Sequence, residues 1–196
     1  MSACQAPQEE STYGCDTTID KTYFSICYNY NLKSALEVTY TLDGSKVYAN
    51  NIEQRENFYI EPTIPREYAA SYDDYRGSGY DRGHLASDAS FDYSKEALYA
   101  TYSLANIAAQ EPQLNRGVWL EAEKLEREMA YEDGEAFVTI ELHFSDNPQR
   151  IGEGEIAVAT LFEKIIVTPK QKRCFLFDNL PYESDETLED FEIECE

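Results

Sequence analysis

The sequence has few histidines and few cations. Only two of its 196 residues are histidine, and 16 lysines and arginines stand against 38 aspartates and glutamates, which gives a formal net charge of -22. A charge of this size keeps a protein in solution and repels polyanions at long range. Composition alone therefore argues against a nucleic-acid partner, unless arginines gather locally to offset the acids.

Long apolar runs and short cysteine spacings are also absent. No stretch of about 18 apolar residues occurs, so the sequence predicts no membrane-spanning segment. None of the five cysteines forms a Cys-x-x-Cys pair or a Cys/His metal spacing, which argues against a zinc finger.

Most of the cysteines lie near the two ends of the chain. We expect at least one disulfide among Cys15, Cys27, Cys174 and Cys195, and therefore an oxidising compartment, with the protein secreted or periplasmic. The segment Ser-Ala-Cys at the start resembles the end of a bacterial lipoprotein signal. On that alternative Cys4 carries a lipid anchor, and four cysteines remain for two bridges.

The length corresponds to one domain, and a hydrophobic content of 42% is sufficient for a packed core. We expect an N-terminal arm over residues 1–20, a globular domain over 21–182 and an acidic C-terminal tail over 183–196, which contains no lysine or arginine. Alternating residues in 21–51 predict strands, with a hairpin turn at Asp43-Gly44.

Further along the chain the patterns change several times. The segments and their expected structures are loop over 60–80, a helix over 94–102 capped by Ser94, a strand over 102–110, a helix over 114–134 ended by Gly134, and strands over 136–144, 155–168 and 173–179. This order predicts an α+β fold with a mixed or antiparallel sheet at its core.

One of the two histidines stands in the segment GSGYDRGHLASDASF, residues 77–91. His84 follows Arg82-Gly83, and Asn115 and Glu123 lie downstream. A histidine can accept a proton from an attacking water, and an arginine can bind phosphate oxygens. Mg²⁺ keeps several waters and takes few protein ligands, so one asparagine oxygen suits it. These residue types are those that phosphodiester hydrolysis requires.

The motifs YDRGHLA and TYSLANIAAQEPQLNRGVWLEAE together resemble the family of non-specific DNA/RNA endonucleases. The strong match covers residues 76–127, and weaker similarity extends over about 21–180. The resemblance implies a ββα-metal finger, in which one strand ends in His84, a second runs through Asn106 and a helix starts at Asn115. It also implies an endonuclease that cuts DNA and RNA with little sequence preference, leaves 5′-phosphates and depends on Mg²⁺, for which Mn²⁺ can substitute.

The resemblance also implies roles for individual residues. His84 is the general base, Asn115 the direct metal ligand and Arg82 the phosphate-binding arginine. Glu123 holds metal-bound waters, and Arg55 matches a second arginine upstream of the motif. Asn106 also matches a family position, where it is either a site residue or a hydrogen-bonding residue at the end of a strand.

Structural roles are the alternative for several of these residues. Asn115 could cap its helix, Glu123 could pair with Arg127 four residues on, and Arg55 could be a surface charge. The sequence departs from the family at Ser87 and Ala109, where the family has prolines, so loop rigidity differs while the base and the ligand are retained.

Two other functions are compatible with the sequence. One is a catalytically inactive nucleic-acid-binding protein or acidic mimic on the same fold, which would have no need of a water-activating base. The other is an enzyme with the same finger and a narrower substrate, such as RNA only.

Overall fold

The computed structural model describes residues 13–182 and 186–195. The strands are β1 (Thr17–Asp20), β2 (Phe24–Asn29), β3 (Ser34–Asp43), β4 (Asp81–His84), β5 (Ile107–Gln110), β6 (Glu135–His143), β7 (Arg150–Ile151), β8 (Ile156–Ala157), β9 (Leu161–Val167), β10 (Lys172–Asp178) and β11 (Glu192–Ile193). The α-helices are α1 (Asp88–Phe91), α2 (Lys95–Thr101), α3 (Pro112–Arg116) and α4 (Val118–Asp133). Short 3-10 helices are η1 (Arg66–Tyr68), η2 (Tyr72–Tyr75), η3 (Leu104–Asn106) and η4 (Leu188–Phe191).

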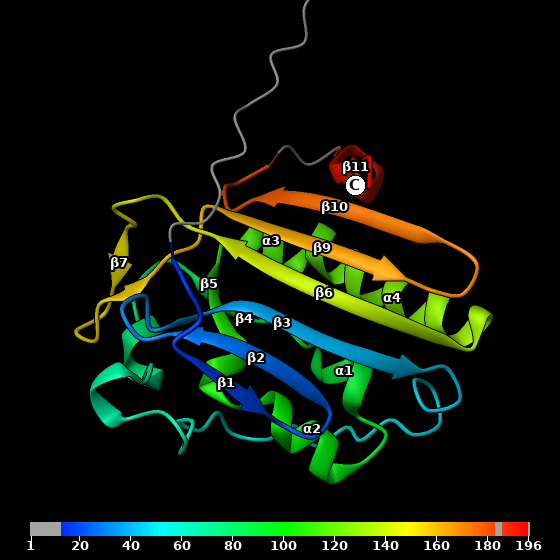
Figure 1. Cartoon of the computed structure of the whole chain (residues 1–196), viewed down its shortest axis with the longest axis horizontal. Coiled ribbons are helices and arrows are strands. Elements are labelled where there is room, and N and C mark those ends of the chain that lie inside the picture. Colours follow the sequence, from blue (N-terminus) through cyan, green and yellow to red (C-terminus); the bar gives the residue numbers. More distant parts are fainter. Residues whose placement is uncertain (1–12, 183–185, 196) are drawn as a thin grey trace, which may run out of the picture.

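Seven strands form one antiparallel sheet in the order β1-β2-β3-β6-β9-β10-β11 (Figure 1). Along β3, Val38, Tyr40 and Leu42 are buried and alternate with Glu37, Thr39 and Thr41 on the other face. This period of two places one face of the sheet against a core and leaves the other open. The α+β class and the antiparallel sheet are as the sequence predicts.

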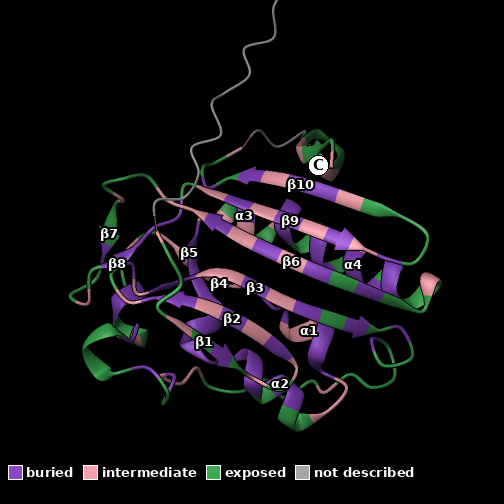
Figure 2. Ribbon diagram, in the orientation of Figure 1, coloured by how far each residue is buried: buried purple, intermediate pink, exposed green. Residues whose placement is uncertain are grey.

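Helix α4 packs against β6 and β3 on the inner face of the sheet (Figure 1). Its buried side chains include Trp119, Ala122 and Met129, which join the main hydrophobic core. The ribbon of α4 accordingly carries both buried and exposed residues (Figure 2). It ends where Gly134 takes a φ of 96°, a conformation that favours glycine. Within the described ranges no helix combines the length and apolarity that crossing a membrane requires.

The predicted hairpin at Asp43-Gly44 is wrong. Strand β3 does end at Asp43, but its next partner is β6, and the chain after Gly44 runs into turns. A Cβ on Gly44 would lie 2.1 Å from the Ala130 carbonyl oxygen, so this glycine is needed for close approach to the end of α4. The Asp-Gly signal is therefore satisfied by a helix–sheet contact and not by a two-residue turn.

Parts of both chain ends belong to the sheet. The arm expected over 1–20 contributes β1, and the expected acidic tail returns as β11, which pairs with β10. Phe191 stacks on Phe177 with ring centroids 5.3 Å apart, so an apolar contact holds the acidic segment in place. Cys4 lies outside the described residues.

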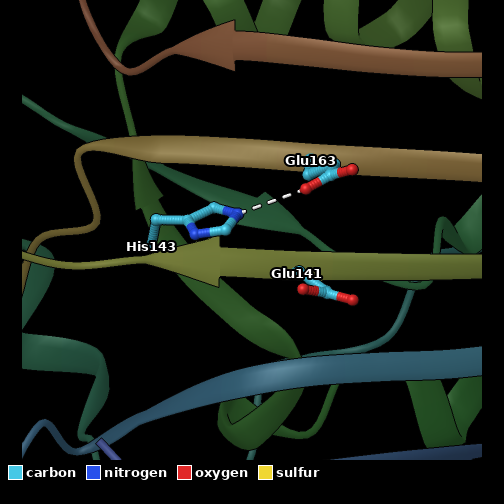
Figure 3. A group of neighbouring side chains, drawn as sticks. All are labelled: Glu141, His143 and Glu163. Atoms are coloured by element: carbon cyan, nitrogen blue, oxygen red, sulfur yellow. Dashed lines mark ion pairs between the residues drawn. The ribbon is translucent and has the colours of Figure 1, made fainter. Parts of the chain in front are cut away.

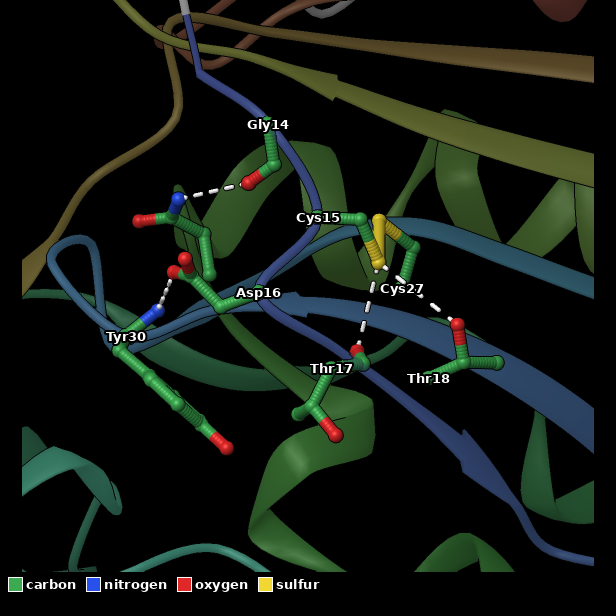
Figure 4. The surroundings of a disulfide bond; sticks show 8 residues. Gly14, Cys15, Asp16, Thr17, Thr18, Cys27 and Tyr30 are labelled. Carbon is green, nitrogen blue, oxygen red and sulfur yellow. Dashed lines mark hydrogen bonds between the residues drawn. A yellow bond between two sulfur atoms is a disulfide. The ribbon is translucent and has the colours of Figure 1, made fainter.

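Two disulfides, Cys15–Cys27 and Cys174–Cys195, fix these end segments, as expected for the four cysteines. The first joins the segment before β1 to β2 (Figure 4). Around it, Asn29 Nδ2 donates to the Gly14 carbonyl at 2.8 Å. Closing a loop of this kind stabilises the fold mainly by restricting the unfolded chain.

Candidate active site

The Asp81-Arg82-Gly83-His84 motif forms strand β4, which pairs antiparallel with β5. In this pair Gly83 faces the buried side chain of Gln110, and a Cβ on Gly83 would lie 1.8 Å from Gln110 Oε1. Only glycine allows the two strands to approach this closely with the glutamine between them. The motif glycine therefore fixes the path of β4 immediately before His84.

His84 is half-buried at the end of β4. Its ring lies against Phe58 and Tyr102, with centroids 5.5 and 5.0 Å away. Burial lowers the pKa of His84 to about 4, an effect that the negative charge of Asp88 opposes. His84 is therefore neutral at physiological pH, in the state that can accept a proton, and its pKa lies below the ordinary histidine value of 6.5.

The strand that carries His84 is joined directly to α4. Trp119 Nε1 donates a hydrogen bond of 3.2 Å to the His84 carbonyl oxygen. Trp119 is fully buried, so this bond holds the start of α4 against β4 from inside the core. The two strands and the helix thus form one ββα unit.

Asn115 reaches the same strand through a polar contact. Its Nδ2 donates to Asp81 Oδ2 at 3.0 Å, and Arg116 binds both oxygens of the same carboxylate at 2.7 Å each. Because the amide NH₂ is held by Asp81, the orientation of Asn115 leaves its Oδ1 as a hard oxygen donor. This donor set fits Mg²⁺, which binds oxygen and keeps most of its waters.

Asn115 does not open the long helix, contrary to the sequence prediction. Helix α3 contains Asn115 and ends at Arg116, and Gly117 separates it from α4 with φ -112° and ψ -110°. The alternative role of Asn115 as a helix cap is also excluded, since Glu111 caps α3. The break means that helical spacing does not relate Asn115 to Glu123.

Glu123 points into the interior from α4 and is only 9% exposed. Burial raises the pKa of Glu123 to about 7; Lys164 lowers it and Glu126 raises it further. Glu126 itself is fully buried and accepts hydrogen bonds from Lys164 (2.7 Å), Ser90 (2.8 Å) and Tyr40 (3.0 Å). A satisfied ionic network therefore lies directly behind Glu123.

The two arginines predicted as site residues, Arg82 and Arg55, differ in their surroundings. The guanidinium of Arg82 lies over the rings of Tyr72 and Phe58, at 4.2 and 5.4 Å from their centroids. Arg55 is paired with Asp88 (3.3 Å) and Asp92 (3.4 Å), so its charge is largely neutralised within the protein. Among the described residues no ion pair is found for Arg82, whereas Arg55 has two.

Asn106 is fully buried, and its side chain bonds only to backbone groups. Its Oδ1 accepts from the Ala86 amide at 2.9 Å, and its Nδ2 donates to the carbonyls of Ala86 (2.9 Å) and Thr101 (3.0 Å). These bonds hold the loop that follows His84. The structure thus gives Asn106 the hydrogen-bonding position that the sequence leaves as an alternative.

The departures from the family pattern are both buried. Ser87, 1% exposed, precedes α1, and Ala109 pairs with Arg82 in the β4–β5 ladder. Neither contacts Asn115 or His84 through a described hydrogen bond.

Several residues of the site carry no signal in the sequence. Phe58 lies beside His84 because two backbone hydrogen bonds fix the neighbouring residue, Tyr59. The Tyr59 N–H donates to the Tyr102 carbonyl at 3.0 Å, and the Leu104 N–H donates to the Tyr59 carbonyl at 2.8 Å. Lys164 comes from β9 of the main sheet, whose sequence does not indicate a contact with α4. Asp81 stands three residues before His84 in the motif, but its contact with Asn115 depends on tertiary packing.

A family model described as DNA/RNA non-specific endonuclease matches residues 6–196. Among curated proteins, the chain is 27% identical to human mitochondrial endonuclease G over 88% of its own length and 63% of that protein. It is 29% identical to the mitochondrial nuclease EXOG of Xenopus laevis over 71% of its length, and 31% identical to a nuclease of a Nostoc species over 60%. The chain thus spans under two thirds of the length of each of these relatives.

A similar fold is seen in a solved structure, the "Crystal structure of the EndoG/EndoGI complex: Mechanism of EndoG inhibition". The TM-score is 0.80 at 22% identity, over 92% of this chain and 81% of the other. At this identity the likeness establishes the fold. The assignment to a family rests on the sequence model, which covers nearly the whole chain.

Proposed function

Because the chain belongs to the DNA/RNA non-specific endonuclease family, we propose that it is a metal-dependent endonuclease that hydrolyses DNA and RNA with little sequence preference. The observation that carries the proposal is the contact between Asp81 and Asn115. It joins the oxygen donor of α3 to the strand that ends in His84, with 3.0 Å between Asn115 Nδ2 and Asp81 Oδ2. A base and a metal-ligating oxygen are thus held on one rigid unit.

In the proposed reaction His84 accepts a proton from the water that attacks phosphorus. The bond from phosphorus to the 3′ oxygen breaks, which leaves a 5′-phosphate, and the 3′ oxygen takes up a proton from solvent. Arg82 binds a phosphate oxygen through charge-assisted hydrogen bonds. Asn115 would hold Mg²⁺, or Mn²⁺ in its place, which supplies positive charge beside the leaving oxygen when bound. Glu123 would contact such an ion through water. Arg55 forms ion pairs with Asp88 and Asp92, and Asp88 acts electrostatically on His84.

Digestion of plasmid DNA and of RNA tests the activity. We expect the purified protein to cleave both in Mg²⁺ and neither in EDTA. Cleavage of RNA alone would favour the narrower substrate. Binding of an oligonucleotide without cleavage in Mg²⁺ or Mn²⁺ would contradict the proposal and favour a non-catalytic binding protein.

The proposed roles of Asn115 and Glu123 predict different metal dependences. Asn115→Ala removes a direct ligand, whereas Glu123→Gln alters only contacts through water. The Mg²⁺ concentration for half-maximal rate should rise on the order of 10-fold in Glu123→Gln and several times more in Asn115→Ala. Rates titrated against Mg²⁺ measure this, and equal shifts in the two variants would remove the distinction between direct and water-mediated ligands.

The net charge of -22 predicts an unusual salt dependence. A basic nucleic-acid binder loses affinity steeply with salt because it releases counterions from phosphates. Here long-range repulsion opposes encounter at low salt, and at ~0.1 M the Debye length of about 10 Å screens most of it. We expect cleavage of long DNA not to fall steeply between ~10 mM and ~0.2 M NaCl, and to peak above the lowest salt. A steep fall from the lowest salt onward would show that the local arginines control binding.

We also propose that the protein works in an oxidising compartment, secreted or periplasmic. The two disulfides support this location, since such bonds persist where thiols are not kept reduced. Several curated relatives are mitochondrial by name. Mass spectrometry of the unreduced natural protein would decide: free thiols at all four positions would contradict the proposal.

A further inference from the structure

A second group of chemically active side chains lies on the open face of the sheet, away from α4. Glu141 and His143 are two residues apart on β6, so they share one face, and Glu163 on β9 is paired directly with Glu141 (Figure 3). The neighbouring Leu142 points to the opposite, buried face. The proposed nuclease site uses none of the three.

The three side chains converge. One ligand atom from each lies within 4.8 Å of the others, and His143 Nε2 is 3.4 Å from Glu163 Oε2. Nε2 is shielded from solvent, and this contact is too long for a well-formed hydrogen bond. In a tetrahedral shell, metal–ligand bonds of about 2.0–2.2 Å place ligand atoms roughly 3.3–3.6 Å apart. Small side-chain rotations would bring all three atoms onto one ion.

The charge around this group is poorly balanced. Glu37 on β3 is paired with Glu141, so three glutamates form a row across β3, β6 and β9. Like charges facing each other across strands are destabilising. Burial and the charges of Glu163 and Glu37 raise the pKa of Glu141, and Glu163 raises the pKa of His143. In the described part of the chain, His143 is the one basic side chain in an ion pair with this row.

We propose that Glu141, His143 and Glu163 bind a divalent transition-metal ion of the Zn²⁺ type, separate from the ion at Asn115. One imidazole nitrogen with two carboxylates is a mixed donor set that suits Zn²⁺ and similar ions, whereas Mg²⁺ and Ca²⁺ prefer oxygen alone. The three side chains are half-buried, so a water can complete a tetrahedral shell. The bound ion would link β6 to β9 and relieve the repulsion within the glutamate row.

Calorimetric titration of the full chain with Zn²⁺ tests the proposal. It is done in the Asn115→Ala background, so that the other site does not contribute. His143→Gln removes the nitrogen ligand without changing the charge of a neutral imidazole. We expect it to weaken the Zn²⁺ affinity at least about tenfold, since even outer-shell changes typically cost that much. Glu163→Gln should weaken it similarly, and Mg²⁺ should not compete at comparable concentrations.

Glu37→Gln is the matched control, because it removes one charge from the same row without removing a ligand. We expect it to change the Zn²⁺ affinity much less than Glu163→Gln does. Unchanged affinity in His143→Gln, or equal losses in Glu37→Gln and Glu163→Gln, would overturn the site and leave only diffuse attraction of a cation to acids. Circular dichroism verifies that each variant is folded.

Discussion

Replacing His84 with alanine is expected to lower the turnover number by about 10²–10⁴-fold, the usual contribution of a positioned base. His84 is the motif residue able to accept a proton, and its ring is held by Phe58 and Tyr102 in the neutral state. The turnover of a defined oligonucleotide measures the loss, and circular dichroism checks the fold. Cleavage near the wild-type rate in His84→Ala would remove the assignment of the base.

Exogenous imidazole separates chemistry from packing. His84→Gly leaves a space between Phe58 and Tyr102 into which imidazole can diffuse, and partial recovery of turnover is expected if the lost group is a base. A purely structural role would not be restored in this way. Absence of rescue together with a lowered melting temperature would assign the effect to packing.

The pH dependence of the wild-type cleavage rate also tests the role of His84 as the base. Since burial lowers the pKa of His84 to about 4, the base stays neutral down to that pH. The rate should fall only as the pH drops through about 4, and not near the ordinary histidine value of 6.5. Below pH 6.5 the unfolded chain binds more protons at this residue than the folded one, so acid lowers stability and the folded fraction must be followed at each pH.

The sequence predicts the ends of helices best where a single local rule decides them. Ser94 caps α2 by accepting from the Ala97 amide at 3.1 Å, and Gly134 ends α4, as residue type alone indicates. The motif spacing and the resemblance to the family likewise predict that His84 ends one strand, that a second strand follows, and that Asn115 lies on a helix after it.

The remaining features depend on contacts between distant segments. Asp43-Gly44 reads as a hairpin, and only the approach of Ala130 shows why the glycine is there. The composition of the acidic end indicates a tail, and only the contact of Phe191 with Phe177 and the pairing of β11 with β10 show that it also joins the sheet. Local composition cannot report a partner more than ten residues away in the chain, so neither contact could be predicted.

The ionic network behind the site shows the same limit, because nothing in the predicted strand over 155–168 identifies a partner for Lys164. The lysine is fully buried, with Nζ 2.7 Å from Glu126 Oε2 and 4.4 Å from the centre of the Trp119 ring. Two charges in a core are tolerated when each satisfies the other, but one alone carries the full cost of its lost hydration. Removing the lysine should therefore be far more damaging than removing a surface charge.

We expect Lys164→Met to lower the free energy of unfolding by about 3–5 kcal/mol, the range for breaking a buried ion pair. Urea denaturation with the disulfides intact measures the change. Lys164→Met/Glu126→Gln removes both charges and should recover much of the loss, while Lys124→Met, which breaks the exposed Lys124–Glu121 pair, should cost less than about 1 kcal/mol. Loss of Lys164 should also raise the pKa of Glu123, because Lys164 lowers it, and so weaken the response to Mg²⁺. If Lys164→Met unfolds at the same urea concentration as the wild type, with an unchanged slope, the pair does not stabilise the core.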